Sequence, residues 1–206
     1  MRRQAGSRWA LLVSLALLAG CGFTVPQGVI WISPTNLFAE DHIDLTNLLG
    51  PNATCKIRHG GGRSAFELSY EVWENGKRIR EAPLDTQELD GKGFTKRLTI
   101  RLEPIPAEAG RPGLEMLTVT TSEANVFLSS ARVVIDDFGA AQEGLVTAVT
   151  DVRQRVEWSE DDVVPVIAIR RGKKVDDPGY VEGPHEAYDR TILVKARVTG
   201  SATADN

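Results

Sequence analysis

Histidine and cysteine are scarce in this chain of 206 residues, which contains three of the first and two of the second. A zinc centre gathers three or four such side chains at one point, so the composition argues against a histidine-rich metal centre. The nucleophile patterns Gly-x-Ser-x-Gly and Ser-x-x-Lys are also absent from the sequence, which argues against serine acyl-enzymes of those two kinds. We therefore expect a non-enzymatic protein with no cofactor and no metal.

Two other features resemble metal sites only in part. His185 and Glu186 begin a pattern like that of the zinc proteases, but Asp189 stands where the pattern requires its second histidine. Three acidic clusters fall between predicted strands, where carboxylates from two loops would suit a calcium ion. They are Asp136-Asp137, Glu160-Asp161-Asp162 and Asp176-Asp177. None has the spacing of a calcium loop, so we interpret them as solvated loop charges.

The long apolar segment near the start of the chain, residues 9–18, is too short to span a bilayer. Three arginines accompany its start, and small residues follow it directly before Cys21. This three-part arrangement is typical of a secretory signal. The string Leu18-Ala19-Gly20-Cys21 also resembles the end of the signal peptide in bacterial lipoproteins.

That resemblance implies an address and an anchor. In bacterial lipoproteins the cysteine of this pattern receives a diacylglyceryl group and becomes the first residue after cleavage, so Cys21 would be the lipidated residue. We expect an exported protein, held at the bacterial cell membrane by its N-terminal lipid and facing outside the cytoplasm. Residues 1–20 would be the signal peptide, 21–28 a short tether, 29–199 the β-sandwich domain and 200–206 a flexible tail.

Basic residues are outnumbered in the expected mature chain. Removal of residues 1–20 lowers the number of Lys and Arg from 24 to 21, against 28 Asp and Glu, and leaves a formal charge of −7. An acidic protein without a basic patch does not suit nucleic acid as a partner, and an anionic lipid surface would repel it. Besides the membrane itself, we expect an envelope protein or a glycan as the partner.

Cys55 is the second cysteine of the chain, and it has no obvious disulfide partner once Cys21 is lipidated. Apolar and polar residues alternate along residues 53–58, and Cys55 falls on the apolar side. This pattern predicts a buried cysteine in a strand, with an intermolecular disulfide as the alternative.

From Phe66 onward the sequence alternates with the period of two that a half-buried strand requires. Asn75-Gly76 predicts a two-residue hairpin turn, which would pair Trp73 with Arg78 and Val72 with Ile79. Other segments with strand character are 29–32, 53–58, 94–102, 117–119, 126–135, 145–158, 163–169 and 192–198.

Three segments have mixed signals. Residues 36–49 are predicted to be mostly irregular with a short helix, and the glycine-rich residues 59–63 to be a flexible connection between strands. Residues 163–169 are apolar on both faces, which suits a central strand, whereas Pro165 favours an edge or a bulge.

Roughly eight to ten short strands, closely spaced turn signals and almost no helix predict an all-β fold. We expect an antiparallel two-sheet sandwich of immunoglobulin-like architecture with at most one short helix. Two smaller sandwiches divided near residues 136–139 are the alternative.

Three functional hypotheses fit these observations. The leading one is a lipid-anchored, non-catalytic β-sandwich that binds an envelope partner or acts as an accessory subunit. The second is a glycan-binding module whose candidate stacking platforms are Trp73, Trp158, Tyr180 and Tyr188. The third is a hydrolase whose paired carboxylates come from different loops.

Overall fold

Eleven β-strands form two antiparallel sheets in the structure, a computed structural model that describes residues 24–35, 52–105, 114–123, 126–135, 146–152, 154–173, 181 and 187–200. No helix in these residues is long and apolar enough to cross a membrane. The short helix expected within residues 36–49 lies outside the described residues. The prediction of an all-β, antiparallel two-sheet sandwich is confirmed.

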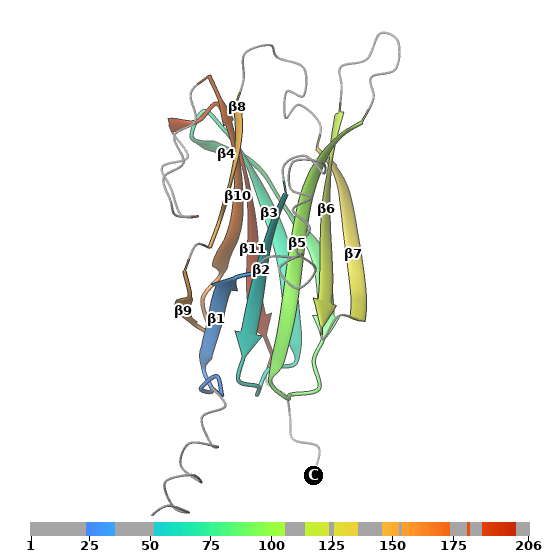
Figure 1. Ribbon diagram of the computed structural model, residues 1–206, viewed down its shortest axis with the longest axis vertical. Helices are drawn as coiled ribbons and strands as arrows, with labels where there is room; N and C mark the ends of the chain where they lie inside the picture. Colours follow the sequence, from blue (N-terminus) through green and yellow to red (C-terminus); the bar gives the residue numbers. More distant parts are fainter. Residues whose placement is uncertain are drawn as a thin grey trace, which may run out of the picture.

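The first sheet has six strands in the order β7-β6-β5-β2-β1-β9, and the second has five in the order β4-β3-β11-β10-β8. The strands of the first sheet are β1 (Val29–Pro34), β2 (Asn52–His59), β5 (Phe94–Ile105), β6 (Leu114–Glu123), β7 (Val126–Ile135) and β9 (Val156–Ser159). Those of the second are β3 (Ala65–Glu74), β4 (Lys77–Glu88), β8 (Val146–Asp151), β10 (Val164–Gly172) and β11 (Arg190–Thr199). Figure 1 shows the strands of both sheets running along the long axis of the molecule.

The core lies between the sheets and takes alternate residues from most strands, because successive side chains of a strand point to opposite faces. In β3 the buried residues are Phe66, Leu68, Tyr70 and Val72, as the sequence predicted. Cys55 is fully buried in β2, which confirms the predicted strand burial. A thiol at this depth does not reach another chain, so the burial argues against an intermolecular disulfide.

β10 resolves the conflict between its two sequence signals. Every residue of the strand is buried, and the strand lies between β11 and β8. Its pairing with β11 shifts between Pro165 and Ile167. An internal strand and a bulge at the proline therefore occur together, because the bulge accommodates the residue that lacks an N–H group.

The alternating segment 145–158 does not form one strand. Its first part, β8, pairs with β10 in the five-stranded sheet, and its second part, β9, pairs with β1 in the six-stranded sheet. Each sheet thus contains strands from before and after residues 136–139, and the two parts of the chain share one core.

The β3–β4 hairpin follows the prediction at its turn and departs from it further along. Asn75 and Gly76 have φ values of 47° and 75°, as a type I′ turn requires, and Trp73 pairs with Arg78. The register then shifts, so that Val72 faces Arg80. The predicted pairing of Val72 with Ile79 is wrong, because the bulge adds one residue to β4 and leaves Ile79 53% exposed.

Residues 24–28 lead directly into β1 at one end of the sandwich, which we call the tether end. The pairings of Ile30 with His59 and of His59 with Phe94 place the end of β2 and the start of β5 at this end. The end of β6 and the start of β7, where Glu123 pairs with Val126, lie toward this end too (Figure 1).

Candidate functional site

Two of the five predicted site residues, Cys21 and Tyr180, lie outside the described residues. The structure does not bring the other three onto one surface. Trp73 lies near the end of β3, and Tyr188 precedes β11 in the same sheet. Trp158 lies in β9, at the edge of the six-stranded sheet.

The three described aromatic rings differ in their surroundings, and Tyr188 does not suit a glycan platform. Tyr188 is buried, and the guanidinium carbon of Arg170 lies 5.3 Å from the centre of its ring. Trp158 is partly buried and packs against the core. Trp73 is partly buried and donates a hydrogen bond through Nε1 to Glu71 Oε2 at 2.9 Å. Stacking on a sugar needs an exposed ring face, which Tyr188 lacks.

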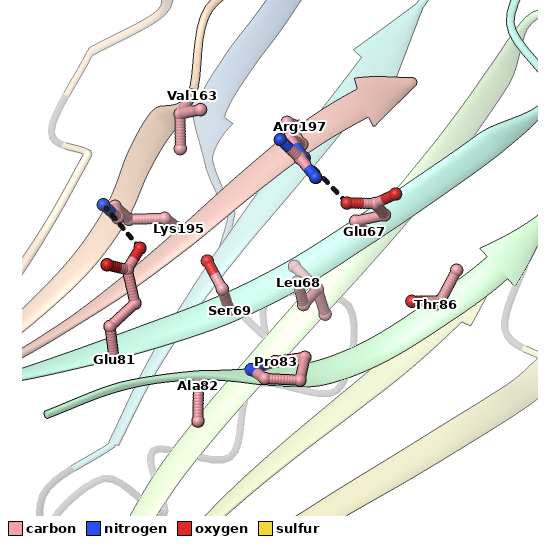
Figure 2. A pocket seen from close by; sticks show the side chains of 10 residues that line it. All are labelled: Glu67, Leu68, Ser69, Glu81, Ala82, Pro83, Thr86, Val163, Lys195 and Arg197. Carbon is pink, nitrogen blue, oxygen red and sulfur yellow. Dashed lines mark hydrogen bonds and ion pairs between the residues drawn. The ribbon is translucent and has the colours of Figure 1, made fainter. Parts of the chain in front are cut away.

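A hollow of about 320 Å³ lies on the outer face of the five-stranded sheet, over β3 and between β4 and β11 (Figure 2). Part of its lining is apolar and comes from Leu68, Ala82, Pro83 and Val163, of which Val163 is 45% exposed. The pairing of β3 with β4 shifts between Leu68 and Ser69, where Ser69 faces Pro83. The hollow therefore lies at a bulge of an edge strand, a place where proline is tolerated.

Two ion pairs flank the hollow on opposite sides, as Figure 2 shows. Arg197 Nε lies 2.7 Å from Glu67 Oε2, and Lys195 Nζ lies 3.9 Å from Glu81 Oε1. The lining is completed by the side chains of Ser69 and Thr86. Charges of both signs and two hydroxyl groups thus lie around the apolar part of the lining.

Glu71 extends this charged rim across three strands. Its carboxylate is 3% exposed and binds the ammonium group of Lys195. It also accepts hydrogen bonds from Arg78 Nη1 at 2.8 Å and from Trp73 Nε1 at 2.9 Å. Arg78 Nη1 lies 2.8 Å from Glu81 Oε2 as well. The network therefore links side chains of β3, β4 and β11.

Two carboxylates of this rim, those of Glu67 and Glu71, are stabilised in their ionised form. Burial alone would raise the pKa of Glu71, but the hydrogen bonds from its three partners outweigh burial and lower that pKa. Hydrogen bonds from Arg197 and Thr199 lower the pKa of Glu67. A general acid or base works best with a pKa near the ambient pH. These two side chains are therefore suited to charge pairing more than to proton transfer.

The sequence predicted the faces of β3 but not this site. Alternation placed Glu67, Ser69 and Glu71 on the polar face, where the structure has them. Their partners Lys195 and Arg197 lie in a strand more than 120 residues further along the chain. Acidic residues on one strand and basic residues on another are the signal that would have suggested the pairing of β3 with β11.

A second charged cluster lies at the tether end. Buried His59 accepts a hydrogen bond at Nδ1 from the backbone N of Gly61 at 3.1 Å, so its Nε2 donates to Glu160 Oε2 at 2.9 Å. Arg63 Nη2 lies 2.6 Å from both Glu160 Oε1 and Asp161 Oδ1. The hydrogen bond from Arg63 is the main cause that lowers the pKa of Glu160.

The glycine-rich connection between β2 and β3 is closely packed, contrary to the predicted flexibility. A Cβ atom on Gly60 would lie 2.5 Å from the carbonyl oxygen of Pro26. Gly61 and Gly62 have φ values of 103° and 91°, which a side chain would strain. The backbone N of Gly62 donates to the carbonyl oxygen of Gly91 at 2.8 Å. Glycine is thus required at Gly60 and Gly61 by close backbone contacts, and at Gly61 and Gly62 by the positive φ.

Among the residues that the structure describes, no three side chains of His, Cys, Asp and Glu are grouped so that they could hold a metal ion. Of the acidic cluster considered for calcium, Glu160 and Asp161 bind Arg63. The clusters at 136–137 and 176–177, and the pair His185 and Glu186, lie outside the described residues.

Comparison of this chain with protein-family models, with curated proteins and with solved structures finds no match.

Proposed function

We propose that the chain is an exported bacterial lipoprotein, anchored by a lipid on Cys21, whose non-catalytic sandwich binds a protein partner at the cell envelope or serves there as an accessory subunit. The observation that carries the binding role is the hollow over β3. The apolar part of its lining lies between charged groups. This is the layout of a protein interface, in which an apolar centre is surrounded by a polar rim. The hollow would receive an apolar side chain of the partner.

Two further observations support a binding role over a catalytic one. The pKa values of Glu67 and Glu71 are lowered, so these carboxylates stay charged near neutral pH and suit ion pairing more than proton transfer. Val163 exposes an aliphatic side chain at the wall of the hollow, where a partner would cover it.

Site-specific photo-crosslinking in cells tests the binding role. A photoreactive phenylalanine analogue at Val163 is expected to form one defined adduct with an envelope protein. The same analogue at Ile79 is the matched control, because Ile79 is an exposed aliphatic residue of the same sheet that does not line the hollow. Val163→Glu, with the analogue at Ala82, is expected to abolish the adduct, because a carboxylate would replace the aliphatic side chain at the wall of the hollow.

If Val163 and Ile79 form the same adduct, the proposed binding surface is contradicted. It is also contradicted if neither Val163 nor Ala82 forms an adduct.

The anchor has a separate test. Cells fed a radioactive fatty acid should label the wild-type protein and not Cys21→Ala. Label on both proteins would refute the assignment of Cys21 as the lipidated residue.

A further inference from the structure

The first three residues of β7 form an apolar tip on the surface. Val126, Phe127 and Leu128 are 62%, 63% and 42% exposed. Further along the strand the exposed side chains of Ser130 and Arg132 are polar. Scattered apolar side chains are normal on a protein surface, but three large ones in succession are not. This apolar tip is therefore a candidate contact surface.

The apolar tip lies at the tether end of the sandwich. Val126 is the first residue of β7 and pairs with Glu123, the last residue of β6. In Figure 1 the start of β7 lies in the lower part of the sandwich, somewhat above the start of β1. Between β1 and β7 lie β2, β5 and β6, so these starts are about 19 Å apart at the usual spacing of strands.

The length of the tether limits how far this end stands from the bilayer. Cys21 precedes Gly28 by seven residues, which span about 25 Å when fully extended. Because the tether holds this end of the sandwich close to the bilayer, the effective concentration of the bilayer surface is high. Even a small apolar contact with it is therefore populated. The argument rests on the proposed lipid anchor at Cys21.

The charge of the tether end indicates which lipid surface it suits. Residues 59–64, 88–93, 123 and 159–163 contain six carboxylates, against two basic side chains, Arg63 and Lys92. Asp161 is 80% exposed in its side chain. An anionic surface would repel these groups, whereas a zwitterionic surface would not.

The distribution of apolar residues along β7 favours a contact at the end of this strand over the addition of a partner's strand along its edge. A strand added to β7 would contact side chains along the whole edge. Here the exposed apolar residues are concentrated in the apolar tip, and Val134 stands alone near the other end.

We propose that the apolar tip inserts among the headgroups of the zwitterionic phospholipid surface that carries the Cys21 lipid. Apolar side chains at a bilayer interface are stabilised by leaving water. The lipid and the apolar tip would hold the same end of the sandwich at two points, so that its strands rise from the membrane and the hollow over β3 faces sideways.

The test uses the lipidated full-length protein, reconstituted into vesicles of phosphatidylcholine and phosphatidylethanolamine. Phe127→Cys and Arg132→Cys each carry an environment-sensitive fluorophore, because the lipid occupies Cys21 and Cys55 is buried. Arg132 is the matched control, an exposed position five residues further along the same strand. On vesicles, emission at position 127 should shift to shorter wavelength, and its quenching by iodide should fall about threefold relative to position 132.

Each alternative has its own outcome. A protein that does not float with the vesicles contradicts the lipid anchor itself. A protein that floats, with position 127 as open to iodide as position 132, contradicts the apolar-tip contact alone. Shielding of position 127 that grows with protein density would assign the apolar tip to a second copy of the chain and overturn the lipid contact.

Discussion

Arg171 and Glu115 join the two sheets through the interior of the sandwich. Nη1 and Nη2 of Arg171, on β10, lie 2.9 and 2.8 Å from the two carboxylate oxygens of Glu115, on β6. Nε donates to Thr147 Oγ1 at 2.9 Å. Both charged side chains are buried. A two-pronged pair of this kind fixes the orientation of both partners, so it aligns the sheets as well as pairing the charges.

Removal of one member of this pair should be costly. Arg171→Met leaves the Glu115 carboxylate buried without its cation and should lower the free energy of unfolding by about 3–5 kcal/mol. The double variant Arg171→Met with Glu115→Leu should lose less than Arg171→Met alone, because it buries no charge. Urea unfolding of the wild type, of Arg171→Met and Glu115→Leu alone, and of the double variant measures these values. A double variant as unstable as the sum of the single variants would show that the two residues do not act as a pair.

Stability should fall in acid, and Glu71 should contribute to that fall. The folded-state pKa values of Glu67, Glu71 and Glu160 are lowered from 4.5. The stabilisation from each is therefore present above its unfolded-state pKa and is lost as the pH falls through the folded-state value. The urea midpoint should drop steadily between about pH 5 and pH 3.

Glu71→Gln should reduce this dependence on pH while it lowers stability at pH 7, since Lys195 and Arg78 lose a charged partner. Glu88→Gln is the control, because Glu88 is an exposed carboxylate. Its effect at pH 7 should stay within about 0.5 kcal/mol. Equal pH profiles for the wild type and Glu71→Gln would remove Glu71 from the account of acid sensitivity.

The sequence predicts local features of this fold better than long-range ones. Residues next to each other in the chain determine the alternation of β3 and the Asn75-Gly76 turn, and both are confirmed. The ion pair between Glu71 and Lys195 depends instead on which strands become neighbours. Nothing in either strand alone specifies that neighbour, so the alternation predicted a polar face for Glu71 but not its burial.

The same limit explains why the sequence indicates one alternating segment over residues 145–158. The period of two is the same in β8 and β9, whichever sheet a strand joins. The strand pairing, in which Trp158 faces Ile30 of β1, is what shows that β9 belongs to the six-stranded sheet. The hollow was not predicted for a related reason, because it depends on a bulge of β4 next to Pro83 and on the adjacency of β11.

The bulge near the hairpin can be tested through Val72 and Ile79. The structure buries Val72 and leaves Ile79 exposed. Val72→Ala should cost about 2 kcal/mol of unfolding free energy through lost burial and the cavity it leaves. Ile79→Ala should change stability by no more than about 0.5 kcal/mol. Thermal and urea unfolding measure both, and similar losses for the two variants would favour the unbulged register in which both residues point inward.

Gly60 should prove to be the residue that holds the start of β1 against the rest of the sandwich. A Cβ atom on Gly60 would lie 2.5 Å from the carbonyl oxygen of Pro26, and backbone atoms cannot yield as a flexible side chain does. Gly60→Ala should therefore displace residues 24–28 and cost about 1–3 kcal/mol. Gly62→Ala is the matched control, since no atom lies within 4 Å of its added Cβ and its φ of 91° alone makes the substitution unfavourable.

Global stability does not separate these two variants, because strain at a positive φ costs about 1–2 kcal/mol. Local opening does separate them. Under native conditions, amide hydrogen exchange in residues 24–34 should speed up in Gly60→Ala and stay near the wild-type rate in Gly62→Ala, because only the first substitution collides with the segment that leads into β1. Equal exchange in both variants would mean that the Gly60 contact does not position this segment.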